Sequence, residues 1–117
     1  MTSQDPNNEI VYLVVRGKVQ HVVFRQAIMR AAIKRNVVAG ATNDESDPDR
    51  VEISLQGPKD KVQEIIDGLK SGKPLNSFGA HCTSVEIVKT GKNPLEHESN
   101  TAKYDMTRRD GTCEFYL

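Results

Sequence analysis

The sequence predicts an α+β fold in which two helices cover one face of an antiparallel sheet. Segments with the periodicity of strands and of helices alternate along the chain in the order βαββαβ. Turns marked by glycine or proline separate most of these segments. The 117 residues are enough for one hydrophobic core and too few for two independent ones, so all the elements belong to one domain.

The first strand and the first helix are expected at residues 10–17 and 24–35. The run IVYLVVRG is rich in β-branched residues and ends at a glycine, which is typical of a buried strand. Apolar residues then recur at the i, i+3, i+4 and i+7 spacing of an amphipathic helix, namely Phe24, Ala27, Ile28 and Ala31. Residues 17–23 therefore form a loop from strand to helix.

Two further strands follow, at residues 36–43 and 50–57. The first reads NVVAGATN and is weak by propensity because of its Ala-Gly-Ala centre. The second, RVEISLQG, alternates apolar and polar residues and predicts a half-buried strand. An acidic turn, DESDPDR, lies between them.

The second helix and the fourth strand complete the βαββαβ order. Pro58 suits a first helical turn, and an apolar stripe follows it, consisting of Val62, Ile65, Ile66 and Leu69. Gly72 and Pro74 end this helix, and the alternation in residues 81–89 predicts a strand. With right-handed crossovers this order gives a ferredoxin-like sandwich with both helices on one face.

The two ends of the chain are more polar than the predicted core. Residues 1–9 are expected to be a polar tail that precedes a domain spanning residues 10–117. Residues 90–111 contain only four hydrophobic side chains and predict a long exposed loop. Residues 112–117, TCEFYL, resume a strand pattern that would add a fifth strand at a sheet edge.

Composition excludes several classes of protein. The longest uncharged apolar run, residues 10–15, is far shorter than the roughly 20 residues that span a bilayer. The polar start lacks a secretory apolar stretch, so we expect a cytoplasmic protein without a membrane partner. Cys82 and Cys113 are too few for a disulfide framework, and neither lies in a CxxC pair that would indicate a metal site.

The formal net charge of zero hides a local excess of positive charge. Residues 10–43 contain six Lys and Arg side chains and no carboxylate. The loop at residues 17–23 leads into a helix N-terminus, where unpaired N–H groups and the helix dipole favour an anion. Arg25 lies in the first helical turn, and its guanidinium matches two phosphate oxygens. These features indicate a phosphate site, to which Lys18 adds positive field.

The residues of this loop resemble a known family. GKVQHVVFR, residues 17–25, is similar to the acylphosphatase signature G-x-V-Q-G-V-x-F-R, and Asn43 falls eighteen positions after Arg25, where the family keeps its catalytic asparagine. The similarity continues through the Q-G-P junction at residues 56–58 and fades after residue 89. It implies an enzyme that hydrolyses small acyl phosphates to carboxylate and inorganic phosphate without a metal or a cofactor. We expect this enzyme to be a monomer.

The resemblance also implies roles for individual residues. Arg25 and Asn43 would be catalytic, with the Asn43 amide orienting the attacking water. The expected phosphate-binding residues are Gly17, Lys18, Val19, Gln20, His21, Val22, Val23 and Arg25. The leaving group is a weakly basic carboxylate, so no strong general acid is needed, and a phosphate oxygen of the substrate would accept the proton by analogy with the family.

His21 replaces the central glycine of the signature. If that glycine provides a positive φ, histidine is among the better tolerated replacements; if it provides clearance, the imidazole would crowd the site. The second outcome leaves open an alternative function, a non-catalytic anion-binding or regulatory module. Nucleic-acid binding is not expected, because only Tyr12 and Phe24 are aromatic in the basic segment.

Overall fold

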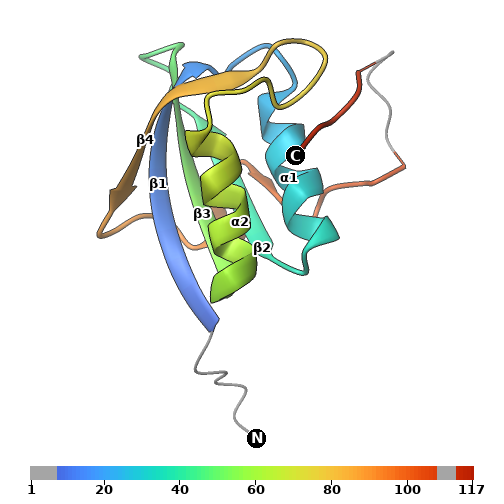
Figure 1. Cartoon of the computed structure of the whole chain (residues 1–117). Helices are drawn as coiled ribbons and strands as arrows, with labels where there is room; N and C mark the ends of the chain where they lie inside the picture. Colours follow the sequence, from blue (N-terminus) through green and yellow to red (C-terminus); the bar gives the residue numbers. More distant parts are fainter. Residues whose placement is uncertain (1–7, 108–112) are drawn as a thin grey trace, which may run out of the picture.

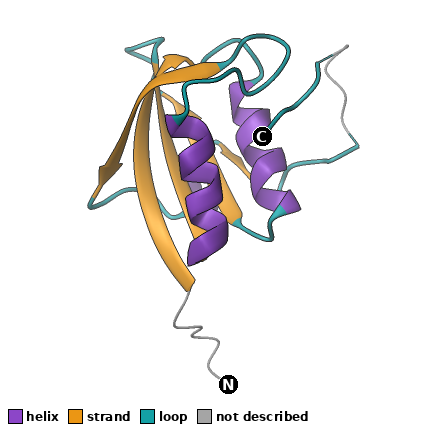
Figure 2. Cartoon of the chain, viewed as in Figure 1, coloured by secondary structure: helices purple, strands orange, loops and turns teal. Residues whose placement is uncertain are grey.

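The computed structural model describes residues 8–107 and 113–117. A five-stranded antiparallel sheet with the strand order β4-β1-β3-β2-β5 carries both helices on one face (Figures 1 and 2). The elements are β1 (Asn8–Lys18), α1 (Phe24–Lys34), β2 (Val38–Asn43), β3 (Arg50–Pro58), α2 (Lys59–Lys70), β4 (His81–Val88), the 3₁₀ helix η1 (Pro94–Glu96) and β5 (Ser99–Asn100). The expected ferredoxin-like sandwich is confirmed. Most of the expected tail, residues 1–7, lies outside the described residues.

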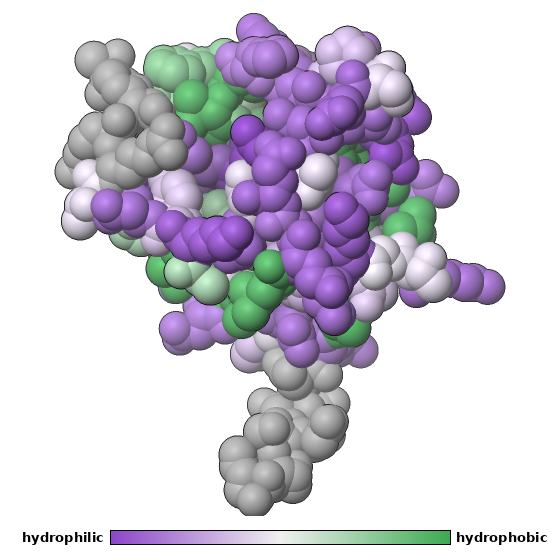
Figure 3. Space-filling model, turned by 180° about the vertical axis from the view of Figure 1, so that it is seen from behind, coloured by the Kyte–Doolittle hydropathy of each residue, from purple (hydrophilic) through white to green (hydrophobic). Residues whose placement is uncertain are grey.

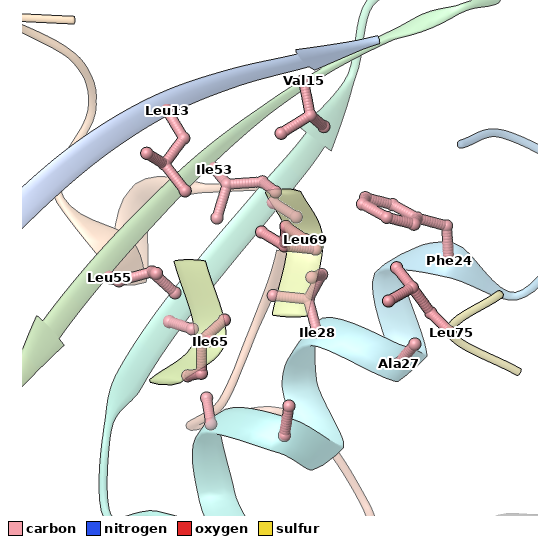
Figure 4. Packing of buried hydrophobic residues seen from close by; sticks show 14 of the residues in the cluster. Leu13, Val15, Phe24, Ala27, Ile28, Ile53, Leu55, Ile65, Leu69 and Leu75 are labelled. Carbon is pink, nitrogen blue, oxygen red and sulfur yellow. The ribbon is translucent and has the colours of Figure 1, made fainter. Parts of the chain in front are cut away.

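The core fills the space between the sheet and the two helices. Leu13 of β1 and Ile53 of β3 point toward Ile28 of α1 and Leu69 of α2 (Figure 4). All four side chains are at most 1% exposed. Because aliphatic residues of all four elements meet here, the core fixes both helices against the strands that hold the loop at residues 17–23 and the end of β2.

The opposite face of the sheet is partly covered by residues 89–100, which we name the rear strap. After β4 this segment passes behind the sheet (Figure 1), where η1 packs against β2 and β5 pairs with the edge of β2. Seen from behind, the surface is mostly hydrophilic (Figure 3). The expectation of an exposed loop is therefore wrong at Pro94, His97 and Asn100, which are buried.

The small residues of β2 make room for the rear strap. Ala39 and Ala41 face the helices and are fully buried, whereas Gly40 faces the strap. A Cβ atom on Gly40 would lie 2.0 Å from the Pro94 carbonyl oxygen and 2.7 Å from the Cβ of His97. The Ala-Gly-Ala sequence that made this strand weak by propensity is thus required by close packing.

The fifth strand is not where the sequence pattern placed it. Residues 99–100 take the edge of β2, with Asn100 opposite Gly40 and Ser99 opposite Ala41. Of the expected strand at 112–117, residue 112 lies outside the described part, and Phe115 forms only an isolated bridge with Asn76. Leu117 lies against Gly68 of α2 instead. The end of the chain therefore packs on α2 and not at the β2 edge, which β5 occupies.

Neither of the two α-helices has the length and apolar composition of a membrane span.

Candidate active site

The loop between β1 and α1 contains two residues in the left-handed region. His21 has φ 64° and Val23 has φ 59°. Such angles are uncommon outside glycine and are unusual for a β-branched residue. The position of His21 takes a positive φ, which histidine can adopt, as the first of the two expected outcomes requires. Strained backbone of this kind persists where the surroundings hold it in place.

Asn76 holds this loop from behind. It is 1% exposed, and its Nδ2 donates to the carbonyl oxygens of Val22 at 2.9 Å and Val23 at 3.4 Å. In a trans peptide the following N–H points the opposite way, so the N–H groups of Val23 and Phe24 point away from Asn76. No sequence pattern marks this residue, because it stands alone in a short turn outside the motif.

The first turn of α1 keeps donors available to a ligand. Its N-cap is Val23, and among the described residues no side chain makes a capping bond there. The first turn also has no acidic residue. Unpaired N–H groups together with the positive end of the helix dipole favour an anion at this position.

Arg25 and Asn43 meet at one pocket of about 210 Å³. Its volume is below the roughly 300–1,000 Å³ typical of sites for drug-sized ligands, so it suits a small molecule. The lining residues are Val19, Gln20, His21, Val23, Phe24, Arg25, Gln26 and Asn43. Two segments far apart in the sequence, the loop before α1 and the end of β2, are thereby brought together as predicted.

Three of the expected phosphate-binding residues are not among those lining the pocket. Gly17 and Lys18 line a shallow hollow beside His81, and Val22 packs against the core. A Cβ on Gly17 would lie 2.6 Å from the His81 carbonyl oxygen and 2.7 Å from the Thr83 nitrogen. The glycine therefore permits the close approach of β4, not of a ligand.

The side chain of Gln20 holds the turn that follows Asn43. Its Nε2 lies 2.9–3.1 Å from the carbonyl oxygens of Asp44, Asp47 and Arg50. The Asp44 carboxylate accepts from the side chain and backbone of Ser46 and from Arg50, and these contacts lower its pKa below the ordinary value. The turn is thus fixed against the loop at residues 17–23.

Asn43 brings a side-chain amide to the lining of the pocket. It is the last residue of β2 and pairs with Val51 of β3. Its Oδ1 is buried and accepts no hydrogen bond from any described residue. Buried polar atoms are nearly always paired, so this oxygen calls for a donor from a bound molecule such as water.

Glu98 is a site residue that the sequence did not predict. Its carboxylate accepts a hydrogen bond from the Arg25 guanidinium. The Glu98 side chain is 52% exposed and the Arg25 side chain is 31% exposed. Exposed ion pairs contribute about 0–1 kcal/mol, so this one does not bind the arginine tightly. A guanidinium has five N–H donors, which leaves several for a phosphate. Glu98 lies in the polar segment that was expected to be exposed, where no motif marks it.

Within the described residues, no group of three or more His, Cys, Asp and Glu side chains is arranged to hold a metal ion.

Comparison with known proteins gives one consistent family. A family model described as Acylphosphatase matches residues 11–100. The acylphosphatase of Pyrobaculum arsenaticum is 41% identical over 76 residues, which cover 65% of this chain and 75% of that protein. The acylphosphatase of Bacillus subtilis is 34% identical over 64 residues, which cover 55% and 68%.

Solved structures of the same kind share the fold. An acylphosphatase from Coxiella burnetii matches with a TM-score of 0.61 and 24% identity, covering 80% of this chain and 94% of that one. A crystal structure of the Bacillus subtilis acylphosphatase matches with a TM-score of 0.57 and 27% identity, covering 73% and 89%.

Proposed function

The chain belongs to the acylphosphatase family, and we propose that Arg25, the loop before α1 and Asn43 together hydrolyse small acyl phosphates to a carboxylate and inorganic phosphate. This activity requires charge stabilisation and a positioned water rather than a strong acid. The pocket supplies a cation, backbone donors and a buried amide oxygen.

The phosphoryl group binds where the donors converge. Arg25 donates to two of its oxygens, and the N–H groups of Val23 and Phe24, which point away from Asn76, donate to the others. These donors are fixed before the substrate arrives, so they stabilise developing charge on the phosphoryl oxygens without reorganising. Lys18 acts only through its positive field.

Asn43 positions the nucleophile. Its Oδ1 accepts a hydrogen bond from a water molecule and so directs a water lone pair toward phosphorus. The water oxygen forms the new P–O bond as the bond between phosphorus and the carboxyl oxygen breaks. The electron pair leaves with the carboxylate, and a phosphate oxygen takes the water proton.

The observation that carries this function is that Arg25 and Asn43, from two distant segments, line one pocket. Purified protein should hydrolyse acetyl phosphate and benzoyl phosphate in the presence of a metal chelator. Asn43→Ala should lower kcat by at least about 100-fold, while the inhibition constant of inorganic phosphate stays within about twofold. Arg25→Ala should weaken phosphate inhibition as well.

Lys18→Ala provides the matched control, since it removes a cation beside the loop but outside the pocket lining. Its effect on kcat should stay below about threefold. Absence of turnover in the unmodified chain would refute the function, and equal loss of phosphate binding in the Asn43 and Arg25 variants would refute the division of roles.

The enzyme is further proposed to act as a cytoplasmic monomer that binds no nucleic acid. Arg25 and Asn43 line the same pocket of a single chain, so the proposed chemistry needs no residue from a second copy. Sedimentation of the purified protein at micromolar concentration tests this, and a stable dimer would contradict it.

A further inference from the structure

His97 is a buried histidine that the proposed chemistry does not use. It is 3% exposed and lies on the rear face of the sheet, away from the helices. Its Nδ1 is 2.9 Å from the hydroxyl of Thr42 on β2, and its Nε2 is 2.8 Å from the hydroxyl of Ser54 on β3. The imidazole therefore connects the rear strap to two neighbouring strands.

The hydrogen-bond partners determine the tautomer of this imidazole. The Ser54 hydroxyl donates to the Lys92 carbonyl oxygen at 2.5 Å, so its oxygen accepts from His97. Nε2 therefore carries the proton, and Nδ1 of the neutral ring is an acceptor. The Thr42 hydroxyl donates to Nδ1 and accepts from the Glu98 N–H at 3.0 Å. Each member of the network is satisfied when His97 is neutral.

The network ends one residue from the proposed water-binding amide. Thr42 and Asn43 are consecutive in β2, so their side chains lie on opposite faces of the sheet. Thr42 bonds to His97 at the rear, and Asn43 lines the pocket at the front. With Gly40 and Ala41 preceding them, the end of β2 has little side-chain bulk of its own to fix its position.

We propose that His97 is a positioning residue for acyl phosphate hydrolysis: its neutral imidazole holds the end of β2 through Thr42 and thereby sets the place of the Asn43 Oδ1. This inference rests on the proposed role of Asn43. A displacement of about 1 Å of a positioned group can cost about 100-fold in rate, so a contact behind the strand can control kcat.

The charges around His97 favour its neutral form. Burial lowers its pKa from the ordinary value of 6.5, and the Lys92 ammonium lowers it further, against the opposing effects of Glu52 on β3 and Glu96 in the strap. The folded state therefore disfavours protonation of the His97 imidazole. The network is intact above pH 6.5 and is lost as the pH falls through the depressed pKa, where Nδ1 becomes a donor.

Two hydroxyl deletions separate positioning from general stability. Thr42→Val and Ser54→Ala each remove one hydroxyl that bonds His97, but only Thr42 adjoins Asn43. Benzoyl phosphate turnover should give a kcat about 10-fold lower for Thr42→Val and within about twofold of the unmodified chain for Ser54→Ala. Phosphate inhibition should change less than about twofold in both variants. Thr42→Ser, which keeps the hydroxyl, should have a kcat close to that of the unmodified chain.

The pH profile provides a readout that a structural role would not move. His97→Asn places a non-titrating acceptor near Thr42, so the ratio of kcat in the unmodified chain to that in the variant should fall as the pH drops through the lowered pKa of His97. A constant ratio across the pH range in which the His97 ring titrates, followed by nuclear magnetic resonance, would overturn the proposal. So would equal kcat losses in Thr42→Val and Ser54→Ala at matched denaturation midpoints.

Asn43→Ala distinguishes the two possible failures. If Asn43→Ala retains full activity, the proposed role of Asn43 fails and the positioning inference fails with it. If Asn43→Ala is inactive and Thr42→Val has normal kcat, the proposed function stands and the inference about His97 is wrong.

Discussion

Glu98 accepts a hydrogen bond from the guanidinium of Arg25, which lines the same pocket as Asn43, so a carboxylate of the rear strap shares this arginine with any anion that binds. The pair explains how a cation is accommodated in the first turn of a helix, where the dipole disfavours positive charge. A phosphate that binds Arg25 must therefore compete with the Glu98 carboxylate for the guanidinium.

Glu98→Gln should tighten phosphate binding. The variant keeps the shape of the side chain and removes the negative charge, so the inhibition constant of inorganic phosphate should fall about 2- to 5-fold at low ionic strength. High salt should reduce the difference, because the pair is exposed to screening.

Glu86→Gln is the charge-matched control for this measurement, since it lies on β4 at the opposite edge of the sheet from β5. It should leave the inhibition constant within about 1.5-fold. Equal changes in the two variants would show that net charge, and not the contact with Arg25, decides phosphate affinity.

His21→Gly should leave turnover within about threefold of the unmodified chain. The backbone at this position already has φ 64°, so glycine changes no backbone donor of the loop. Relief of left-handed strain and the greater freedom of the unfolded glycine should largely cancel, which keeps the free energy of unfolding within about 1 kcal/mol. A gain in turnover of 10-fold or more would instead support the non-catalytic alternative.

The order of the first six elements could be predicted because it depends on local periodicity. Arg25 and Asn43 were assigned roles through the resemblance to the acylphosphatase signature, since an asparagine before an acidic turn has no catalytic pattern of its own. The partners of the site could not be predicted in this way. Asn76 and Glu98 act through contacts across more than 50 residues of sequence, and neither belongs to a repeating pattern.

The rear strap was missed for a different physical reason. Its composition is polar, and burial is usually inferred from apolar residues. His97 and Asn100 are buried because hydrogen bonds satisfy their polar atoms, and the space they occupy exists because Gly40 has no side chain. A sequence that places glycine on one strand and histidine 57 positions later gives no local sign of this contact.

Gly40→Ala should destabilise the protein by about 1–3 kcal/mol or more. The added methyl group would lie 2.0 Å from the Pro94 carbonyl oxygen, so the rear strap must move off β2. Urea unfolding measures the cost. Gly57→Ala is the control on β3, where the nearest contact would be 3.2 Å from a Val37 methyl group, and it should cost less than about 1 kcal/mol. Similar costs in both variants would contradict close packing of the strap.

The two thiols should differ sharply in reactivity. Cys82 is 4% exposed and burial raises its pKa to about 12, whereas Cys113 is only half-buried. The thiolate is the reactive form, so at pH 8 an aromatic disulfide reagent should titrate one thiol per folded chain.

The second thiol should react only as the protein unfolds, because Cys82 belongs to the hydrophobic core. Its labelling rate should rise with urea in parallel with the loss of far-ultraviolet circular dichroism. Cys113→Ser should abolish the fast reaction and leave the slow one unchanged. Rapid labelling of Cys82 in the folded Cys113→Ser protein would show that β4 opens locally. Cys82 would then not be held by the hydrophobic core that fixes β1 and the loop at residues 17–23.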